Sequence, residues 1–447
     1  MADYDLLVLG AGNAGIAAAN AALKAGWSVA VVEKRDVGGT CPLRGCVPKK
    51  VLVAAAQTFD VISRADRQQV SVKDPSLEWA KLIEHKHGFI EGVSDEMKSS
   101  IEKRGAKVLA GKGRFVGPTT IELDGKRIEA RKIVIATGSK PRSLPFPGAK
   151  HLLTSDDLLE LRNQPTSAVF IGAGVISLEF SHVLARAGVH VSILEADERP
   201  LSSMENSAVA QLIKASDKLG IKLITSAKVT GIERKQTGFS VQYLCDGENQ
   251  AIEAEIVVNG AGRIADIDEL NLNAAGIEHD HGIKVDEYLR SVSNPHVWVA
   301  GDALSNSPQL SPVATYEGQI AGNNLLNGDL QKPDYHPIPS CVFTVPALAQ
   351  VGYTEVKARD LGLSFETKEN DMTSWRSARM HAEDVAYAKV LIDKNSDQIL
   401  GAHLLGHQAA ELIHLFAFAI KHGVTARAMK ETVYAYPTFT SDIKFLV

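Results

Sequence analysis

Two segments of the chain repeat the same order of a short apolar strand, a glycine-rich turn, a helix and a second strand. The first runs over residues 5–33 and carries Gly-Ala-Gly-Asn-Ala-Gly at 10–15, and the second runs over 168–195 and carries Gly-Ala-Gly-Val-Ile-Ser at 172–177. A turn of this kind brings backbone N–H groups against a pyrophosphate and aims a helix N-terminus at its negative charge. The repeat therefore predicts an α/β fold with two dinucleotide-binding domains.

An acidic residue ends the second strand of each repeat. Glu33 and Glu195 stand about 20 residues after their glycine turns, where a carboxylate accepts hydrogen bonds from a ribose hydroxyl. At Glu195 the carboxylate also repels a 2′-phosphate, so the second site favours NADH over NADPH. Arg199 lies close enough in sequence to leave NADPH as an alternative.

Composition narrows the class of protein. The chain has 447 residues, of which 45% are hydrophobic and 23% charged, which is typical of a globular protein with more than one domain. A net charge of -5 predicts neither a nucleic-acid partner nor a membrane surface. The first residues carry an acid where a secretory leader is basic, and we expect a cytoplasmic location.

Two of the four cysteines lie close together just after the first repeat. Cys41 and Cys46 are five residues apart in Gly-Gly-Thr-Cys-Pro-Leu-Arg-Gly-Cys-Val-Pro-Lys-Lys at 38–50, while Cys245 and Cys341 lie far from them. Four cysteines are too few for a disulfide scaffold in a chain of this length. Their spacing across a glycine predicts a small ring that opens and closes by oxidation and reduction.

This stretch resembles the redox-active disulfide of the class I flavoprotein disulfide reductases, which include glutathione reductase, dihydrolipoamide dehydrogenase and mercuric reductase. The resemblance covers essentially the whole chain. It implies a homodimer that binds FAD in the first repeat and NADH or NADPH in the second. It also implies that Cys46 contacts the flavin and that Cys41 attacks the substrate, which is a small molecule or a protein.

The resemblance implies further site residues. Glu179 would pair with a lysine beside the flavin, either Lys49 or Lys50, and Asp302 would bind the ribityl chain. The residues expected to contact the two cofactors are Gly10, Gly12, Gly15, Glu33, Gly39, Thr40, Gly113, Thr137, Gly138, Gly301, Asp302 and Ala303 for FAD, and Gly172, Gly174, Glu195 and Gly262 for the nicotinamide nucleotide.

The same resemblance predicts the division of the chain. We expect two Rossmann-like dinucleotide-binding domains and a C-terminal α+β dimerisation domain. The expected parts are an FAD-binding domain at 1–145, an NAD(P)H-binding domain at 146–262, a segment completing the FAD domain at 263–332, and an interface domain at 333–447. Proline clusters at 141–147 and 333–339 mark two of these boundaries.

The C-terminal segment departs from the family pattern. Disulfide reductases of this family carry a histidine before Pro-Thr and a glutamate five residues later, and this pair moves protons for the interchange thiol. Here Tyr436 stands in the histidine's place and Ser441 in the glutamate's. Tyr436 is either a catalytic hydrogen-bond donor or an ordinary interface residue. Rapid turnover of glutathione disulfide or lipoamide is therefore not expected.

Other conspicuous residues have simpler interpretations. The four histidines of the last domain, at 403, 407, 414 and 422, do not share one helix face, and we expect structural roles and no metal site. Arg44 lowers a thiolate pKa, contacts an anionic substrate or is a solvated charge.

Three functions remain open from the sequence. The chain reduces a disulfide or other soft electrophile through Cys41 and Cys46, or its flavin reduces a quinone, metal or metalloid ion with little disulfide turnover. In the third alternative, it transfers electrons within a complex that contains a lipoyl or thioredoxin-like partner.

Overall fold

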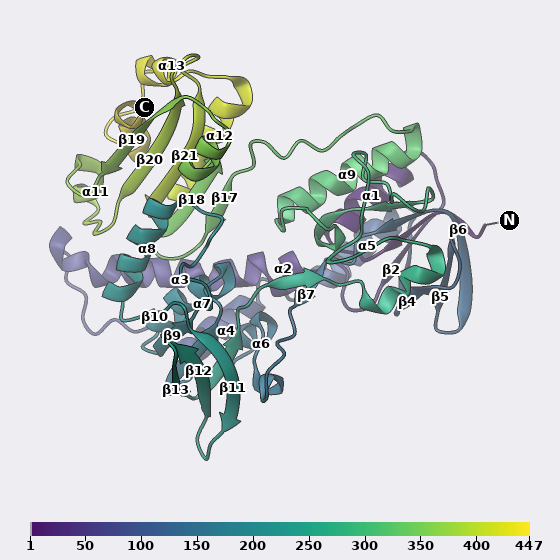
Figure 1. Cartoon of the computed structure of the whole chain (residues 1–447), viewed down its shortest axis with the longest axis horizontal. Coiled ribbons are helices and arrows are strands. Elements are labelled where there is room, and N and C mark those ends of the chain that lie inside the picture. The colour runs from purple at the N-terminus through teal and green to yellow at the C-terminus, as the bar shows by residue number, and fades with distance from the viewer. Residues whose placement is uncertain (1) are drawn as a thin grey trace. The chain divides into compact units, whose positions relative to one another are not determined.

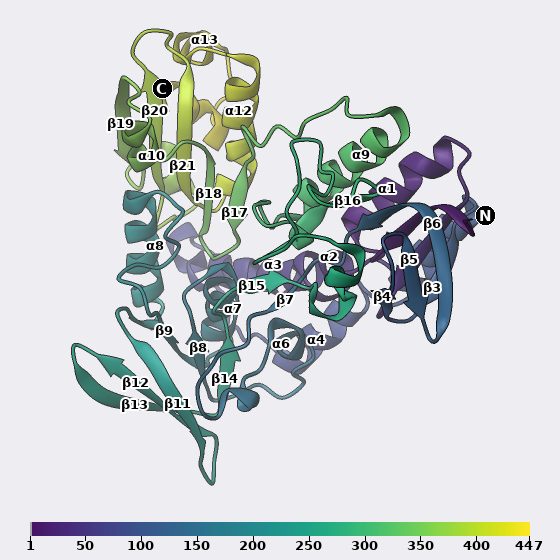
Figure 2. The same ribbon diagram turned by 45° about the vertical axis from the view of Figure 1, so that its right-hand side comes forward.

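A computed structural model describes residues 2–447, which form two compact units. Unit 1 comprises the residues up to Lys49, His85–Arg142 and Gly262–Asp334, and unit 2 comprises Lys50–Glu84, Ser143–Ala261 and Tyr335–Val447. The ribbon is shown in Figure 1 and, turned by 45°, in Figure 2. The finer four-part division expected from the sequence stays a prediction.

Unit 1 is built on a seven-stranded sheet whose central strands are parallel. Its path runs β3-β2-β1-β6-β5-β4, and β16 pairs with β6. Leu6, Leu7, Val8 and Leu9 are all buried, as expected for a strand covered on both faces. The strands of this unit are β1 (Tyr4–Leu9), β2 (Val29–Glu33), β3 (Lys107–Ala110), β4 (Gly113–Phe115), β5 (Thr120–Leu123), β6 (Lys126–Ile135), β7 (Ser139–Pro141), β15 (Arg263–Ala265) and β16 (Val297–Val299).

Two helices of unit 1 pack against each other at unusually short range. In Figure 1 helix α9 (Ser311–Asn327) lies along α1 (Asn13–Lys24). A Cβ atom at Gly318 would lie 2.2 Å from the carbonyl oxygen of Ala14, and one at Gly322 would lie 2.7 Å from the Cβ of Ala21. Only glycine fits at these two positions of α9, so the alanine-rich face of α1 and the glycines of α9 together fix the spacing of the helices.

The remaining helical elements of the first 150 residues follow the chain order. Residues 76–104 contain two helices separated by a turn that contains Gly88 and Gly92. The elements are α2 (Thr40–Arg44), α3 (Cys46–Ser63), the 3-10 helix η1 (Ala65–Gln68), α4 (Trp79–His87) and α5 (Val93–Lys103). Later elements of unit 1 are the 3-10 helices η3 (Asp268–Leu270), η4 (Leu272–Ala275) and η5 (Gly301–Ala303).

Unit 2 contains the second glycine-turn repeat in a four-stranded parallel sheet of order β10-β9-β8-β14. A three-stranded antiparallel sheet, β11-β12-β13, extends beside it and is seen as long arrows in Figure 2. The elements are η2 (Ala149–His151), α6 (Ser155–Leu159), β8 (Ser167–Ile171), α7 (Val175–Arg186), β9 (His190–Leu194), α8 (Asn206–Lys218), β10 (Lys222–Ile224), β11 (Lys228–Arg234), β12 (Phe239–Cys245), β13 (Glu248–Ala254) and β14 (Ile256–Asn259).

The C-terminal part of unit 2 is a five-stranded antiparallel sheet of order β17-β18-β21-β20-β19. Helix α12 (Ala409–His422) packs on β18 and β21 and buries Ile413 and Phe416. The other elements are β17 (Ser340–Val342), β18 (Ala347–Gly352), α10 (Glu355–Asp360), β19 (Phe365–Asp371), α11 (Arg376–Met380), β20 (Tyr387–Asp393), β21 (Ile399–Gly406), α13 (Ala426–Glu431), η6 (Phe439–Asp442) and α14 (Ile443–Leu446).

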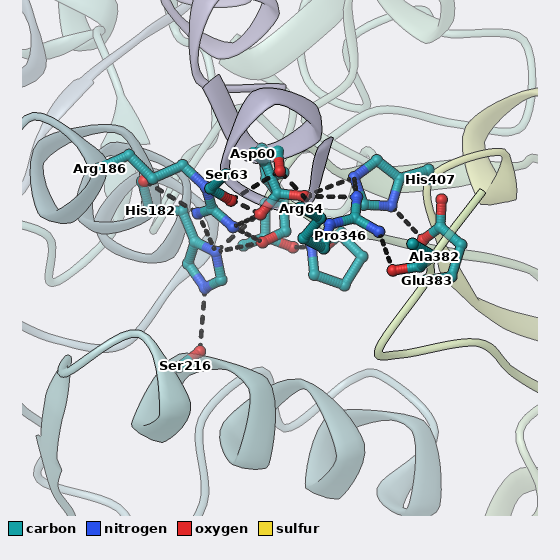
Figure 3. Close-up of polar contacts among 12 residues, drawn as sticks. Asp60, Ser63, Arg64, His182, Arg186, Ser216, Pro346, Ala382, Glu383 and His407 are labelled. Atoms are coloured by element: carbon teal, nitrogen blue, oxygen red, sulfur yellow. Dashed lines mark hydrogen bonds and ion pairs between the residues drawn. The ribbon is translucent and has the colours of Figure 1, made fainter. Parts of the chain in front are cut away.

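An ionic network joins three parts of unit 2 around Asp60 of α3 (Figure 3). Asp60 accepts from Arg186 Nη2 at 2.6 Å and from Arg64 Nη2 at 2.7 Å, and it lies 3.0 Å from His407 Nε2. The other ring nitrogen of His407 contacts Glu383. Helix α7, helix α3 and the loops that carry Glu383 and His407 are thereby tied to one partly buried carboxylate.

The network holds His407 as a cation. Burial opposes this charge, but the hydrogen bonds with Asp60 and Glu383 raise the pKa of His407 to about 9. Arg64 Nη2, 3.2 Å from His407 Nε2, also opposes it, and the two carboxylates outweigh that repulsion. Burial likewise disfavours ionised Asp60, yet the His407 hydrogen bond and the two guanidinium charges hold its pKa well below the usual range.

We predict that this network makes the protein less stable as the pH rises from about 6.5 to 9. The folded pKa of His407 lies above its unfolded value, so its stabilisation is complete below the unfolded pKa and is lost as pH rises through the folded pKa. A shift of this size corresponds to about 3 kcal/mol. The free energy of unfolding in urea, measured across this pH range, should fall for the wild type and should lack this fall in His407→Gln.

The exposed His414 of α12 supplies the control, because His414→Gln should keep the wild-type decline. Equal slopes in the wild type and in His407→Gln would contradict the prediction.

Candidate functional site

The two cysteines of the 38–50 stretch occupy adjoining helix starts. Cys41 lies in the short helix α2, and Cys46 is the first residue of the 18-residue helix α3. Gly45 separates the two helices, and a Cβ there would lie 2.9 Å from the Thr40 carbonyl oxygen. Gly39, at φ +69°, packs against Gly12, whose Cα would lie 2.8 Å from a Cβ at Gly39. The cysteine stretch is therefore held directly against the first glycine turn.

The two thiols share one hydrogen bond, which separates their pKa values. The hydrogen bond from Cys46 lowers the pKa of Cys41 to about 6 against the effect of burial, and hydrogen bonds from Ser311 and Asn13 add to it. The same bond and burial raise the pKa of Cys46 well above its usual range, although the charge of Lys49 acts in the opposite direction. In the reduced pair the structure places the thiolate on Cys41, and a thiolate is the reactive form of cysteine.

The two lysines after Cys46 have different surroundings. Lys49 acts electrostatically on Cys46, whereas the ammonium of Lys50 lies 3.9 Å above the Phe343 ring. The backbone N–H of Phe343 donates to Glu179 Oε1 at 2.6 Å. Of the two alternatives, Lys49 is the lysine directed at the redox pair.

The first glycine turn has the geometry of a pyrophosphate cradle. The Ala11 N–H donates to Glu33 Oε2 at 2.8 Å, and the Arg35 N–H donates to Glu33 Oε1 at 2.8 Å. Gly10 has φ +103°, and a Cβ at Gly15 would lie 1.9 Å from the Gly10 oxygen. The carboxylate of Glu33 thus sits at the turn with lone pairs left to accept ribose hydroxyls, and the N-terminus of α1 stays open to an anion.

Polar groups of the strand ends in unit 1 fit a flavin. The hydroxyl of Thr137 is buried and has no hydrogen-bond partner within residues 2–447. The carboxylate of Asp302 accepts from Ser139 Oγ at 2.7 Å, and Ser139 Oγ in turn accepts from Arg263 Nε at 2.9 Å. An unpaired buried hydroxyl and an oriented carboxylate are what a bound polar cofactor would satisfy. These residues therefore fit FAD.

The other residues expected at the flavin lie in the same unit. Gly138 and Gly301 have φ +72° and +75°, where glycine is favoured. Gly113 lies in β4, and a Cβ there would crowd Leu9 and Val32. The remaining residues expected at the flavin are Thr40 at the start of α2 and Ala303 in η5. Gly262, which was expected at the nicotinamide nucleotide, belongs to unit 1, whereas Gly172, Gly174 and Glu195 belong to unit 2.

The second glycine turn repeats the arrangement of the first. The Ala173 N–H donates to Glu195 Oε2 at 2.5 Å, and the Asp197 N–H donates to Glu195 Oε1 at 3.0 Å. Gly172 has φ +90°, and Gly174 precedes the first residue of α7. The side chain of Arg199 donates to the carbonyl oxygens of Ser202 and Met204, so its guanidinium is directed at that loop.

Ser177, the last residue of the second glycine turn, packs directly against a glycine. A Cβ at Gly260 would lie 1.7 Å from Ser177 Oγ. Gly260 at the end of β14 therefore makes room for the hydroxyl that departs from the usual glycine or alanine.

A groove of about 680 Å³ opens beside the redox pair in unit 1. Its lining includes Asn13, whose side chain lies 2.5 Å from Ser311 Oγ and hydrogen-bonds Cys41. Amides and hydroxyls dominate its polar lining, and Lys24 is its one charged side chain. The lining residues are Asn13, Ile16, Ala17, Asn20, Ala21, Lys24, Ala25, Met97, Thr315, Gln319 and Asn323.

The C-terminal segment places Tyr436 at the surface. Its side chain is 62% exposed, and its hydroxyl oxygen accepts from Arg376 Nη1 at 2.8 Å. Ser441 is buried and caps η6 together with Thr438. Asp442 accepts from Ser377, and burial raises the pKa of Asp442. The residue in the family's glutamate position therefore serves the local turn.

Sequence reasoning missed several residues of the site. Asn13 lies inside the first glycine motif, and this position was its only local signal. Ser311, which hydrogen-bonds Cys41, lies 298 residues after Asn13 in the sequence. Arg376, which hydrogen-bonds Tyr436, lies between β19 and β20. Glu317, fully buried, accepts from the Gly301 N–H at 2.7 Å and from Ser307 at 2.6 Å. It thereby orients the turn that carries Asp302.

The described residues form neither a metal-binding cluster nor a membrane-spanning helix. Within residues 2–447, no cluster of three or more His, Cys, Asp or Glu side chains has the geometry to hold a metal ion. His403 is buried in β21, and His407 belongs to the ionic network. Among the same residues, every helix is too short or too polar to cross a bilayer.

Comparisons with known proteins find similar sequences and a similar fold over nearly the full chain. The family model for pyridine nucleotide-disulphide oxidoreductase matches residues 4–318, and the model for the dimerisation domain of this family matches residues 338–446. The flavoprotein disulfide reductase RclA from Escherichia coli, known for induction by HOCl, has a similar fold with a TM-score of 0.88. It is 24% identical, and the match covers 99% of each chain.

Three curated relatives show the sequence similarity. A glutathione reductase from Burkholderia cepacia is 32% identical over 98% of this chain and 97% of its own length. A dihydrolipoyl dehydrogenase from Geobacillus stearothermophilus is 31% identical over 98% and 94%. A mercuric reductase from Bacillus cereus is 30% identical over 100% of this chain and 71% of its own length.

The comparisons confirm the predicted α/β fold with a C-terminal dimerisation domain and the predicted dependence on FAD and a pyridine nucleotide. The chain belongs to the pyridine nucleotide-disulphide oxidoreductase family.

Proposed function

We propose that this enzyme uses NADH to reduce the Cys41–Cys46 pair and that Cys41 passes the electrons to an uncharged soft electrophile, such as a neutral disulfide or thiol adduct. One observation carries the proposal: Cys41, with its lowered pKa, is hydrogen-bonded to Asn13, which lines the amide-rich groove. Bound FAD supplies the two-electron relay between the nicotinamide and the cysteine pair.

The groove favours a neutral acceptor. Its lining offers amide donors and acceptors from Asn20, Gln319 and Asn323 and a single cation, Lys24. An acceptor with several carboxylates, such as glutathione disulfide, would leave most of them without a cationic partner. Binding of such a substrate would cost desolvation that the groove does not offset.

A homodimer is part of this proposal, because the model of the family's dimerisation domain matches residues 338–446. The resemblance to the family implies that the C-terminal segment of one subunit lies at the redox pair of the other. Large apolar side chains are exposed there, including Phe418 at 65% and Val433 at 96%. In a dimer these side chains would be covered. Tyr436 would then meet the acceptor at the partner's Cys41. We also expect the enzyme to work in the cytoplasm.

A second candidate follows from the residue in the histidine's place. With Tyr436 as the hydrogen-bond donor, acceptors that need no proton shuttle, such as a quinone or a soft metal ion, would be reduced with little disulfide turnover. An anaerobic NADH titration separates the two, because a working dithiol takes up two electrons beyond those of the flavin.

We predict that Cys41 is the reactive thiol of the reduced enzyme. Alkylation by iodoacetamide, followed by peptide mapping, should label Cys41 with a midpoint near pH 6, since the thiolate is the form that reacts. Ser311→Ala removes a hydrogen bond to Cys41 and should move the midpoint to higher pH, whereas Ser305→Ala, whose hydroxyl bonds Asp280, should not. Preferential labelling of Cys46 would contradict the assignment.

We predict a preference for NADH over NADPH. The Glu195 carboxylate is fixed at the turn and repels a 2′-phosphate, while Arg199 is directed at its own loop. Such a repulsion of about 1.4 kcal/mol corresponds to about tenfold in kcat/KM. Glu195→Gln should lower the ratio of kcat/KM with NADH to kcat/KM with NADPH. Glu198→Gln, which changes an exposed neighbouring residue, should leave this ratio unchanged. Higher kcat/KM with NADPH in the wild type would refute this prediction.

We predict slow turnover of glutathione disulfide and lipoamide near neutral pH, because acid–base relays contribute about a hundredfold to ten-thousandfold and no histidine stands at position 436. Tyr436→His should raise lipoamide turnover. Ser441 is buried in a cap, so the histidine is introduced alone. Steady-state rates with both disulfides provide the test. Wild-type rates equal to those of a dedicated disulfide reductase would contradict the prediction of slow turnover.

A further inference from the structure

The segment 372–384, which lies between β19 and β20, is anchored to the end of α3 and to η1. Arg64 Nη1 donates to the carbonyl oxygens of Ala382 at 2.5 Å and His381 at 3.2 Å. Gln68 donates to the Met380 oxygen at 2.8 Å, and Glu383 contacts His407 of the ionic network. This segment is therefore a fixed part of unit 2.

The opposite side of the same segment holds the C-terminal residues. Trp375 packs edge-on against Phe445, with ring centroids 5.9 Å apart, and His381 lies against Phe439 at 5.1 Å. Ser377 donates to Asp442. The segment thus fixes the position of the chain around η6 and α14.

Arg376 joins this segment to Tyr436. Its Nη1 donates to the phenol oxygen at 2.8 Å. Since the guanidinium has only donors, the phenol must accept here, and its own proton is directed elsewhere. Both side chains are exposed, so that proton faces whatever covers this surface.

We propose that Arg376 is a positioning residue that holds Tyr436 as a hydrogen-bond donor toward the departing group of the acceptor. This inference rests on the proposed function, in which Tyr436 meets the acceptor at the partner's Cys41. A guanidinium beside the phenol polarises its O–H bond and makes it a stronger donor, whereas the histidine of the relatives works as a base.

The reaction that benefits is the first thiol exchange. The Cys41 thiolate attacks a disulfide, the new Cys41–sulfur bond forms as the acceptor's sulfur–sulfur bond breaks, and the second sulfur departs with the electron pair. A hydrogen bond from Tyr436 stabilises this thiolate until solvent protonates it. The benefit is large for a basic alkyl thiolate and small for an aryl thiolate, which leaves readily unaided.

The test is a double-mutant cycle with two neutral disulfides, bis(2-hydroxyethyl) disulfide and an uncharged diaryl disulfide. With the alkyl disulfide, Arg376→Gln and Tyr436→Phe should each lower kcat/KM about tenfold, and the double variant should be no slower than Tyr436→Phe alone. With the aryl disulfide all three should stay within about twofold of the wild type. Arg376→Lys should recover part of the alkyl activity.

Arg379→Gln, on the same short helix, is the matched control and should behave as the wild type with both disulfides. Equal losses with both disulfides, or additive losses in the double variant, would overturn the role of Arg376. Loss in Tyr436→Phe with a normal Arg376→Gln would overturn the inference and leave the proposed function standing. A normal Tyr436→Phe would refute the placement of Tyr436 at the acceptor as well.

Discussion

Close contact between small residues at the N-terminal end of α1 is the constraint on which the redox site depends. Gly39 touches Gly12 with no room for a side chain, and this contact sets the cysteine stretch against the glycine turn. Gly318 lies equally close to Ala14, which brings the start of α9 to α1. Ser311 can therefore reach Asn13, and both can reach Cys41. The hydrogen bond from Cys46 is the main cause of the lowered pKa of Cys41, and the packing of these two helices adds the hydrogen bonds from Ser311 and Asn13.

Local patterns account for what could be predicted from the sequence. The glycine turns, Glu33, Glu195 and the cysteine spacing each lie within a few dozen residues, and their chemistry depends on backbone geometry that short motifs determine. The structure adds that both carboxylates accept the backbone N–H that follows the first glycine of their own turn, Ala11 in one case and Ala173 in the other. Each acid thus shapes its own turn.

The features that escaped prediction come from residues distant in sequence. Ser311 and Glu317 lie on a helix whose position depends on tertiary packing, and no local pattern marks them. Arg376 is an unremarkable arginine in the sequence until the 372–384 segment brings it to Tyr436. Contacts of this kind, between residues distant in sequence, can be recognised only once the fold is known.

The glycines of α9 also limit how this protein can be made more heat-resistant. Replacing a glycine inside a helix by alanine usually stabilises a protein by about 1 kcal/mol, which makes it a standard choice in engineering. At Gly318 and Gly322 the added methyl group would press on α1 and move Ser311 away from Asn13. The enzyme must therefore keep two helix-destabilising glycines in α9. Substitutions that raise its thermal stability have to be sought away from the contact between α1 and α9.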